Sequence, residues 1–516
     1  MTIVELLADV PVIEIWGPQT SPVSAVVYAS DEAIPGACFV AIRGRRTDGY
    51  QFIPDALARG AALVVGGEPP PTSFPSDRTY ARVADPRREL GTLAAAFYDH
   101  PSARMEVIGV TGTDGKTTTT NLIDALLAAG GRRTGLMSTV DFKINDKRWQ
   151  NNSRFTTLEA PEIQRTLAQM AGADVEAAVV ETTSSGLALH RVWGVQYDVA
   201  VVTNISSEHL EVHGTLKRYW RAKAMLCEAV VPERRKNLPA AIAVRPVCVL
   251  NADDASYDYL KPFCRAPIIS YGIDSPADVR AEDVVLGANG TRFRTVLPDG
   301  ADFEVQTPLV GRFNVSNCLA ALAVGHVHGL TPAVMAGALA QFASVPGRME
   351  RIECGQPFTV IVDYAHTAAS LAKVLDVLRP LTSGQLLVVF GSAGERDRKK
   401  RPAMGRVAAQ KADFAVITDE DPREEDAGAI LREIAAGAKA VGAREGERYV
   451  CVLGRREGIA EALRRAQPGD TVLLAGKGHE QSLIVGQQKL PWDDRRVARE
   501  EWYALTRSRA SAPQTD

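Results

Sequence analysis

The sequence predicts an α/β protein of three domains, in which strands of mostly parallel sheets alternate with helices. The chain has 516 residues, which is more than one hydrophobic core usually organises, since domains average about 150 residues. Apolar strand-length runs alternate with helix-length segments, which is typical of parallel βαβ units. This pattern restarts near Arg104 and again near Pro346 and Gly347. We therefore expect domains at residues 1–104, 105–346 and 347–505, followed by a disordered polar tail at 506–516.

The first expected domain is a small α/β unit. Strands are predicted within 24–30 (SAVVYAS), 36–42 (GACFVAI) and 62–67 (ALVVGG), with a helix at 52–61. A Pro-rich segment at 67–77 and a further helix complete it.

The second and third expected domains each repeat strands with intervening helices. In the second, the expected strands lie in 107–112, 177–182, 199–205 and 247–254, with helices from Thr117 and over 215–230. The segment 231–246 interrupts this series and reads as a surface loop. In the third, strands are predicted in 358–366, 386–391, 414–422 and 470–478.

Composition favours a small-molecule partner. The net charge of -3 gives no field that would attract nucleic acid or an anionic membrane. The N-terminus lacks a basic region before an apolar run, and no apolar run reaches membrane-spanning length, so we expect a cytoplasmic protein without membrane insertion. The seven cysteines are scattered singly, which favours reduced thiols over a disulfide or zinc framework.

A glycine-rich turn between a strand and a helix is the first candidate site. The stretch TGTDGKTTTT at 111–120 departs from the standard G-x-x-x-x-G-K-[ST] loop, because Val110 stands at the first glycine position. Its context still suits polyphosphate: backbone N–H groups from Gly112 to Thr117 and the helix N-terminus would bind oxygens, with Lys116 at the outer phosphates and Thr117 towards Mg²⁺. The alternative is a turn that binds no ligand.

Two further strand ends carry potential metal ligands. Glu181 ends an apolar strand, so it would share the phosphate-loop edge of a parallel sheet and could bind a metal. A solvated strand-end glutamate is the alternative. His209 and His213 are spaced i, i+4 but lack the His-Glu-x-x-His arrangement of zinc hydrolases, so we reject a zinc site. His209 could bind Mg²⁺ or a phosphate, or merely follow a helix cap.

Three charged loops follow strands of the third domain. FGSAGERDRKKRPAMG contains Arg396, which could bind a carboxylate or phosphate after a Gly-Ser-Ala-Gly turn. TDEDPREED and AGKGHE also stand directly after strands, so all three loops should share one sheet edge. Runs of charged residues usually form solvated surfaces, but three such loops at one sheet edge favour a functional site.

Taken in order, these motifs resemble those of the Mur ligase family. GVTGTDGKTTT, VVETTSSGLALHR, TNISSEHLEVHGT, YWRAKAMLC, GRFNVSNCLAA, PGRME, VDYAHT, FGSAGERDRKKRPAMG, DEDPREED and GKGHEQ carry the resemblance, which extends through PGACFVAIRGRRTDG in the first domain. The resemblance also explains the loop spacing, because the family uses T-G-T-x-G-K-T. It implies a UDP-binding first domain, a central ATPase domain and a Rossmann-like third domain.

The resemblance further implies an ATP-dependent amide ligase of peptidoglycan precursor synthesis. In the matching branch, a carboxylate of UDP-MurNAc-L-Ala-D-Glu takes the ATP γ-phosphate, and the amine of a diamino acid then displaces phosphate. Implied cofactors are ATP and Mg²⁺, and we expect a monomer. ATP contacts are implied at Gly112, Thr113, Asp114, Gly115, Lys116, Thr117, Thr118, Asn314, Arg348 and Asp363. Implied Mg²⁺ ligands are Thr117, Glu181, His209 and a carbamylated Lys223, with Lys116, Lys223, Glu181 and His209 as the catalytic set.

The same resemblance implies the positions that contact the other two substrates. For the UDP-sugar peptide these are Ser30, Arg45, Arg46, Thr47, Thr156, Thr157, Thr183 and Arg191. For the incoming amino acid they are Arg396, Asp421, Arg423, Gly476 and Glu480.

Several of these positions depart from the family pattern. The family Asn at the phosphate loop is Asp114, D-S-R reads Ala29-Ser30-Asp31, a frequent Gln is Leu189, and TTLEAPE lengthens T-T-P-E. In the amino-acid loop D-N-P-R, the Asn is Asp421, whose charge favours a distal ammonium over a distal carboxylate. Lysine or ornithine is therefore expected over diaminopimelate, which Arg423 keeps possible.

Two other functions stay open at this stage. A ligase of the same chemistry could act on another acceptor, such as a poly-amino-acid or folyl-glutamate type, although such relatives commonly lack or replace the first domain. A nucleotide-binding partner protein without ligase activity would need no modification at Lys223.

Overall fold

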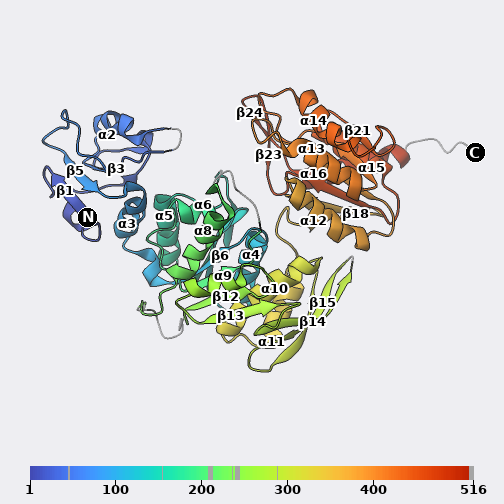
Figure 1. Ribbon diagram of the computed structural model, residues 1–516, viewed down its shortest axis with the longest axis horizontal. Coiled ribbons are helices and arrows are strands. Elements are labelled where there is room, and N and C mark those ends of the chain that lie inside the picture. Colours follow the sequence, from blue (N-terminus) through green and yellow to red (C-terminus); the bar gives the residue numbers. More distant parts are fainter. Residues whose placement is uncertain are drawn as a thin grey trace, which may run out of the picture. The chain divides into compact units, whose positions relative to one another are not determined.

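The computed structural model describes residues 1–44, 47–153, 155–206, 213–234, 236, 238, 245–287 and 289–510. The chain divides into two compact units (Figure 1). The first comprises Met1–Glu282, Arg294–Glu304 and Val315–Leu339, and the second Asp283–Phe293, Val305–Asn314 and Ala340–Asp516. The predicted α/β fold with mostly parallel sheets is confirmed. The boundary predicted near Arg104 lies inside the first unit, between a short 3₁₀ helix and the strand that begins at Glu106.

The N-terminal part of the first unit is a five-stranded sheet in the order β1-β5-β4-β3-β2, with only β1 antiparallel to its neighbour. Its elements are α1 (Ile3–Leu6), β1 (Val12–Trp16), β2 (Val26–Val27), β3 (Cys38–Val40), α2 (Ile53–Ala58), β4 (Leu63–Gly66), β5 (Thr79–Val83) and α3 (Pro86–Phe97). The carboxylate of Asp85 caps α3 by accepting from the amides of Arg87 and Arg88.

An eleven-stranded sheet forms the centre, in the order β16-β15-β14-β13-β12-β11-β6-β10-β7-β8-β9. Its strands are β6 (Glu106–Thr111), β7 (Thr134–Met137), β8 (Asp141–Ile144), β9 (Lys147–Gln150), β10 (Ala177–Glu181), β11 (Val199–Val202), β12 (Val247–Asn251), β13 (Ile268–Gly272), β14 (Val279–Gly287), β15 (Gly290–Val296) and β16 (Asp302–Thr307). The helices of this region are α4 (Lys116–Ala129), α5 (Ala160–Gly172), α6 (Ser184–Ala188), α8 (Leu216–Ala229), α9 (Tyr257–Leu260), α10 (Arg312–Val327) and α11 (Pro332–Gln341).

The register of the central strands determines what lies at the sheet edge. β6 runs parallel to β10 on one side and to β11 on the other, with Glu181 opposite Val110 and Val202 opposite Thr111. All three strands are buried along their length, as expected for a parallel sheet covered on both faces. Their carboxyl ends therefore meet at one edge, immediately before the loop predicted to bind phosphate (residues 111–120, below called the phosphate loop) and the strand-end motifs.

The second unit contains a six-stranded sheet in the order β17-β18-β22-β19-β20-β21, antiparallel only at β17. Its elements are β17 (Glu350–Arg351), β18 (Thr359–Asp363), α12 (Ala368–Leu378), β19 (Leu386–Phe390), α13 (Lys400–Lys411), β20 (Phe414–Ile417), α14 (Ala427–Lys439), β21 (Tyr449–Cys451), α15 (Arg455–Arg465), β22 (Thr471–Ala475) and α16 (Asp494–Ala510). A separate hairpin joins β23 (Ser482–Val485) and β24 (Gln488–Pro491).

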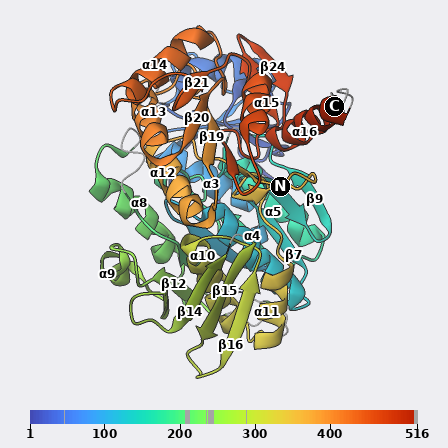
Figure 2. The same ribbon diagram turned by 90° about the vertical axis from the view of Figure 1, so that its right-hand side faces the viewer.

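Alternate residues of this sheet enter two separate cores. Leu386, Val388 and Phe390 pack with α12, α13 and α14, whereas Leu387 and Val389 pack with α15 and α16. Figure 2 shows these two groups of helices on opposite sides of the strands. The two-residue period of a strand produces this division, because successive side chains point to opposite faces.

Two irregular segments show more order than the sequence indicated. In the expected surface loop at 231–246, the side chain of Lys236 is buried, and its ammonium group donates to Met105 O and pairs with Asp198. Burial lowers the pKa of Lys236, and Asp198 opposes that decrease. α16 continues to Ala510, five residues into the expected tail, because the segment contains good helix formers and no proline before Pro513.

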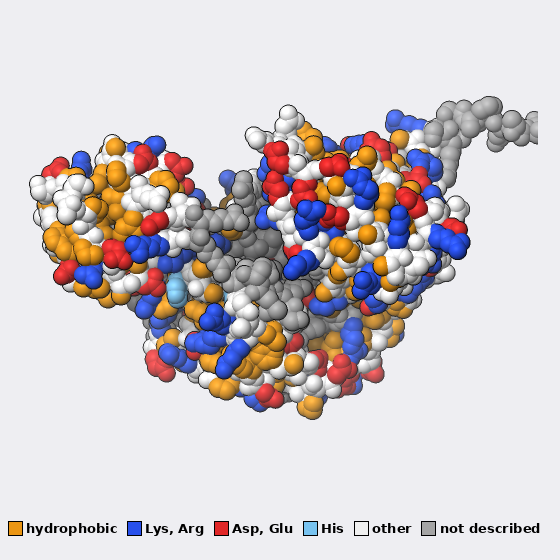
Figure 3. Space-filling view, turned by 45° about the horizontal axis from the view of Figure 1, so that its top comes forward, with side chains coloured by type: hydrophobic (Ala, Val, Ile, Leu, Met, Phe, Trp, Pro, Cys, Tyr) orange, Lys and Arg blue, Asp and Glu red, His pale blue; other side chains and the backbone are white. Residues whose placement is uncertain are grey.

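The visible surface carries charges of both signs. Figure 3 shows Lys and Arg side chains interspersed with Asp and Glu, with hydrophobic side chains between them. Within the described residues, no helix combines the length and the apolar character that crossing a membrane requires.

Candidate functional site

The phosphate loop depends on two glycines at the end of β6. Gly115, which precedes α4, has a φ of 81°, and a Cβ there would stand 2.2 Å from Asn317 Oδ1. Gly112 has a φ of 153°, and its Cβ would stand 1.8 Å from Thr203 Oγ1. Only glycine fits both positions, because each needs an unusual backbone conformation and a close neighbour.

The loop is anchored to the segment after β11. Asn204 accepts from the amides of Thr113 and Asp114, at 2.7 and 3.0 Å, through its carbonyl and its side-chain oxygen respectively. These two amides therefore have protein partners, although the loop sequence had predicted that they would donate to phosphate oxygens. The Thr119 amide donates to Gly115 O at 2.8 Å, one turn back along the chain. The helix itself supplies no acceptor for the amides of residues 115–118, which include Thr118, and these face an anion most naturally.

Two lysines meet on one backbone oxygen of the loop. Lys116 Nζ donates to Gly112 O at 3.1 Å and to Thr113 O at 2.8 Å. Lys223, from the middle of α8, also donates to Gly112 O, and its side chain is 1% exposed. Its ammonium lies 4.7 Å from the centre of the Tyr219 ring. The structure thus brings Lys223, more than a hundred residues away in sequence, directly onto the phosphate loop.

Glu181 and Thr117 form the oxygen-rich side of the site. Glu181 is buried and accepts from Thr117 Oγ1 at 3.1 Å and from the Thr139 amide at 2.8 Å. A hydroxyl and a carboxylate at this separation match the oxygen ligands that Mg²⁺ prefers. His209 lies outside the described residues, as do Arg45 and Arg46. His213 is buried, and its Nε2 lies 3.0 Å from Ser184 Oγ.

The threonines expected to contact the acceptor cluster beside Glu181. Thr139 Oγ1 donates to Thr156 Oγ1 at 3.0 Å, and Thr157 Oγ1 donates to Glu181 O at 3.1 Å. Thr183 donates to Thr157 both from its amide, at 2.9 Å, and from its hydroxyl, at 3.0 Å. The hydroxyl groups therefore continue the polar edge from the carboxylate.

Arg191 has a partner that the sequence analysis did not predict. Its Nε lies 2.9 Å from Glu159, within the lengthened TTLEAPE segment, and Arg87 pairs with the same carboxylate at 2.7 Å. Arg191 also packs over the Phe155 ring, 4.4 Å from its centre. Ser30 and Thr47 belong to the N-terminal sheet region, where Ser30 hydrogen-bonds to Asp55 and Thr47 O accepts from the Gly44 amide at 2.8 Å.

In the second unit, Asp363 fixes the linker that carries Arg348. Asp363 ends β18 and accepts from the amides of Met349 and Ala365, each at 2.8 Å. Arg348 stacks over Tyr364, 4.8 Å from the ring centre, and among the described residues its buried Nε has no hydrogen-bond acceptor. Asn314 is buried at the start of α10 and donates to Val310 O at 2.9 Å.

The three charged loops of the second unit lie together, as the parallel order of β20, β19 and β22 requires. Lys477 is fully buried, and its Nζ donates to Asp421 at 2.9 Å and to Glu480 at 2.6 Å. Asp421 also accepts from the Ile484 amide of the hairpin at 2.9 Å. The Gly394 amide donates to Asp421 O at 2.8 Å, which joins the loop after β19 to the other two.

The remaining predicted residues surround this cluster. Gly476 has a φ of 107°, and a Cβ there would stand 3.0 Å from Glu420 Oε2. Arg423 donates its amide to Ile484 O at 3.1 Å, and its buried Nε finds no acceptor among the described residues. Arg396 is exposed in the loop after β19.

Charge in the cluster is balanced by burial and by Lys477. Burial raises the pKa of Glu480, and Lys477 opposes part of that increase. Burial by itself lowers the pKa of Lys477, but the Glu480 and Asp421 carboxylates outweigh it, so the net change is upward. Nearby, burial lowers the pKa of His366 to about 4 and that of His479 to about 3, so both rings are neutral at neutral pH.

Sequence reasoning missed several residues that shape these sites: Thr139, Glu159, Asn204, Asn317 and Lys477. Asn317 lies beside Gly115 of the loop and accepts from Thr119 Oγ1 at 3.3 Å. The sequence pointed instead to Asn314 of the same motif. Asn204 lies just after β11. An amide side chain at the carboxyl end of a parallel strand is the signal that could have indicated it.

Comparisons with known proteins cover almost the whole chain. Family models match in three consecutive parts: Mur ligase family, catalytic domain, over 22–98; Mur ligase middle domain over 110–325; and Mur ligase, glutamate ligase domain, over 347–478. A UDP-N-acetylmuramyl-tripeptide synthetase of Roseiflexus sp. (strain RS-1) is 48% identical over 488 residues, which is 93% of this chain and 95% of the relative.

Two further relatives are named for a specific amino acid. A UDP-N-acetylmuramoyl-L-alanyl-D-glutamate–2,6-diaminopimelate ligase of Geobacillus kaustophilus is 40% identical over 502 residues, covering 97% of this chain and 99% of the relative. A solved structure of a ligase with the same name is 30% identical with a TM-score of 0.68, covering 98% of this chain and 99% of that one.

Proposed function

Because the chain belongs to the Mur ligase family of ATP-dependent ligases, we propose that it adds a diamino acid to UDP-MurNAc-L-Ala-D-Glu. The observation that carries this proposal is the meeting of Lys116, Lys223 and Gly112 at the phosphate loop, with Thr117 and Glu181 at 3.1 Å on the same sheet edge. The full-length match to tripeptide synthetases supports the acceptor.

The reaction runs in two steps in this proposal. A carboxylate oxygen of the acceptor attacks the γ-phosphorus of ATP, the bond to the ADP oxygen breaks, and an acyl phosphate forms. The amine nitrogen of the diamino acid then attacks the acyl carbon, phosphate leaves, and the nitrogen loses a proton. Lys116 and the first-turn amides of α4 stabilise charge on the transferring phosphoryl group.

Mg²⁺ fits the donors beside the loop. Thr117 Oγ1 and Glu181 would bind it together with His209, and the bound cation would neutralise charge on the phosphate oxygens. Glu181 needs no rearrangement to present its carboxylate, since the Thr139 amide already orients it at 2.8 Å.

Lys223 is proposed to be carbamylated. Its amine, once deprotonated, adds to CO₂, so that a C–N bond forms and a proton is released to water. Support comes from its burial and from its contact with the oxygen that also accepts from Lys116. A carbamate beside Lys116 would make an ion pair with its ammonium and offer oxygens to a second Mg²⁺.

Lysine or ornithine is proposed as the amino acid in preference to diaminopimelate. Lys477 is shared between Asp421 and Glu480, so two carboxyl groups meet one ammonium, an excess of one acidic group. An Asn at position 421 would remove that excess. The excess favours a second ammonium on the substrate and disfavours a distal carboxylate, although the Lys477 contact makes this effect smaller than an unpaired Asp421 would.

An amino-acid panel tests the proposal. The purified chain is incubated with ATP, Mg²⁺ and UDP-MurNAc-L-Ala-D-Glu, and phosphate release is measured with lysine, ornithine and diaminopimelate. We expect turnover that depends on both acceptor and amino acid, with lysine or ornithine the better substrate. The Asp421→Asn variant should shift the kcat/KM ratio towards diaminopimelate by about tenfold, on the order of 1.4 kcal/mol. No turnover with any of the three would refute the assignment, and an unchanged ratio would refute the role of Asp421.

A further inference from the structure

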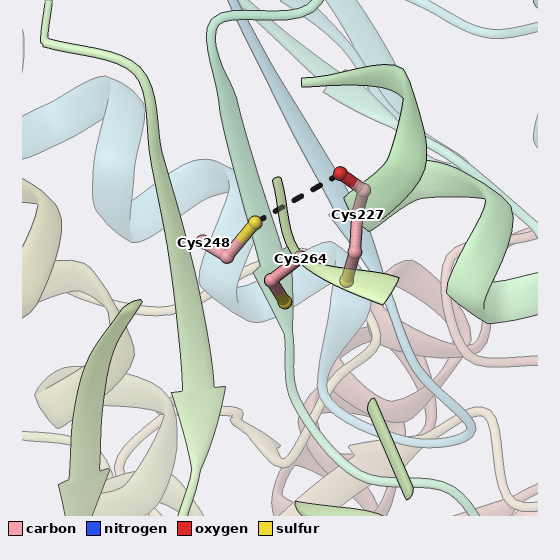
Figure 4. Close-up of side chains that lie close together, drawn as sticks. All are labelled: Cys227, Cys248 and Cys264. Carbon is pink, nitrogen blue, oxygen red and sulfur yellow. Dashed lines mark hydrogen bonds between the residues drawn. The ribbon is translucent and has the colours of Figure 1, made fainter. Parts of the chain in front are cut away.

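Three cysteines that are far apart in the sequence meet in the first unit. Cys227 lies near the C-terminal end of α8, Cys248 lies in β12, and Cys264 follows the 3₁₀ turn Lys261–Phe263. Their sulfur atoms all lie within 4.8 Å of one another (Figure 4). The scattered spacing in the sequence gave no sign of this group, because the fold alone brings the three segments together.

The three sulfur atoms lie in mostly apolar surroundings. Cys227 and Cys248 are fully buried in an apolar core that also contains Leu226, Leu250 and Leu260, and Cys264 packs against it partly exposed. In the described part of the chain, no His, Asp or Glu joins the three sulfur atoms. The group therefore offers soft sulfur donors only, with access from the Cys264 side.

The geometry is close to that of a three-sulfur coordination site. With metal–sulfur bonds of about 2.3 Å, sulfur atoms around one ion stand on the order of 4 Å apart. The observed limit of 4.8 Å is close to this spacing, so small side-chain rotations would complete a site.

Two of the thiols are oriented by backbone oxygens, which would also lie near a bound cation. Cys248 Sγ donates to Cys227 O at 4.0 Å, and Cys264 Sγ donates to Leu260 O at 3.6 Å. Cys227 O belongs to the last turn of α8, where the helix dipole is negative.

We propose that Cys227, Cys248 and Cys264 form a binding site for one thiophilic d¹⁰ cation, Zn²⁺ or Cu⁺, which ties α8 to β12 and to the segment before β13. Thiolates select such cations over Mg²⁺. Cys227 follows Lys223 by four residues, one turn of α8, so an ion here would restrain the helix that presents Lys223 to the phosphate loop. The site is independent of the ligase chemistry proposed above.

Metal titration of the full chain tests this site. Reduced, chelator-treated protein is titrated with Zn²⁺, Cd²⁺ or Cu⁺ in separate arms, and bound ions are counted while thiolate-to-metal charge-transfer absorption is recorded for Cd²⁺ and Cu⁺. We expect one ion per chain, and the arm with the tighter binding identifies the preferred cation. Mg²⁺ in excess should not compete. Failure of all three ions to bind at stoichiometric concentration would overturn the proposal.

Two variants localise the bound ion. Cys264→Ala removes the partly exposed sulfur and is the substitution least disruptive to the core. Because one of the three sulfur ligands is lost, the affinity of this variant for the ion should fall at least about tenfold. Cys318→Ala, at a fully buried cysteine of α10 outside the group, should bind as the parent does. The melting temperature of the parent should rise on ion binding and that of Cys264→Ala should not. Equal binding by Cys264→Ala and the parent would also overturn the proposal.

Discussion

At the scale of the residue, Lys223 carries the sharpest chemical consequence. Lys223 is 1% exposed and shares the Gly112 oxygen with Lys116. A carbamate formed on it by CO₂ would therefore lie beside the Lys116 ammonium. The proposed chemistry therefore depends on one side chain that the motif YWRAKAMLC indicated only through the family resemblance.

We expect Lys223→Ala to reduce phosphate release by at least about 100-fold while nucleotide binding persists, because Lys116 and the α4 amides remain. Lys217→Ala, at an exposed position of the same helix, is the matched control and should keep parental activity. Native mass spectrometry should show a carbamate adduct on the parent and on Lys217→Ala. A fully active Lys223→Ala enzyme would contradict the proposed role.

At the scale of the element, the turn between β6 and α4 depends on Gly115. We expect Gly115→Ala to abolish ATP binding and to lower stability, because its Cβ would stand 2.2 Å from Asn317 Oδ1 at a φ of 81°. Gly131→Ala is the matched control: it has a φ of 84° just beyond the other end of α4, but nothing lies within 4 Å. Its cost should be the backbone strain alone, about 1 kcal/mol.

Calorimetric ATP titration and urea unfolding would measure both glycine variants. Adding Asn317→Ala to Gly115→Ala removes the clash but not the strain, so stability should return to about the level of Gly131→Ala. If Gly115→Ala behaved like Gly131→Ala from the start, the contact with Asn317 would not constrain the loop.

A histidine after α10 links that helix to the first strand of the central sheet. His328 Nε2 lies 2.8 Å from Glu106 Oε1. Burial by itself lowers the pKa of His328, but the hydrogen bond and charge of Glu106 outweigh burial, so the pKa is raised above 6.5. A raised folded-state pKa gives stability that is fully present below 6.5 and is lost as the pH rises through the folded value.

The free energy of unfolding of the first unit should therefore fall as the pH rises from about 6.5 through the raised pKa of His328, and His328→Gln should flatten that dependence. Urea midpoints across this range measure it. His326→Gln, two residues earlier on α10, is the control and should retain the parental slope. Equal slopes for His328→Gln and the parent would show that the Glu106 contact does not titrate.

The elements that the sequence predicted are those whose signal is local. Buried runs such as residues 107–111 predict a parallel strand, the glycine turn after them favours a phosphate loop, and the parallel order then places Glu181 beside Thr117. Strands β8 and β9 were not predicted, because short amphipathic hairpins resemble loops. Contacts such as Asn204 with the loop, Lys477 with Asp421 and the three cysteines join residues far apart, and periodicity carries no information about them.

At the scale of the whole molecule, the two compact units have separate hydrophobic cores, so each should unfold on its own. The second unit contains a buried pair in which Arg455 and Asp494 are both fully buried and Asp494 also accepts from Trp492 Nε1 at 2.7 Å. Removing one member of such a pair leaves an uncompensated buried charge.

We expect calorimetry to resolve two transitions, with Asp494→Ala destabilising only the one that belongs to the second unit, by about 3–5 kcal/mol. Asp376→Ala, which removes a half-exposed partner of Lys411 on α12, should cost less than about 1 kcal/mol. Adding Arg455→Met to Asp494→Ala should recover part of the loss, because the unpaired charge is gone. If Asp494→Ala shifted both transitions equally, the two units would unfold as one cooperative body, and the assignment of separate cores to separate stabilities would fail.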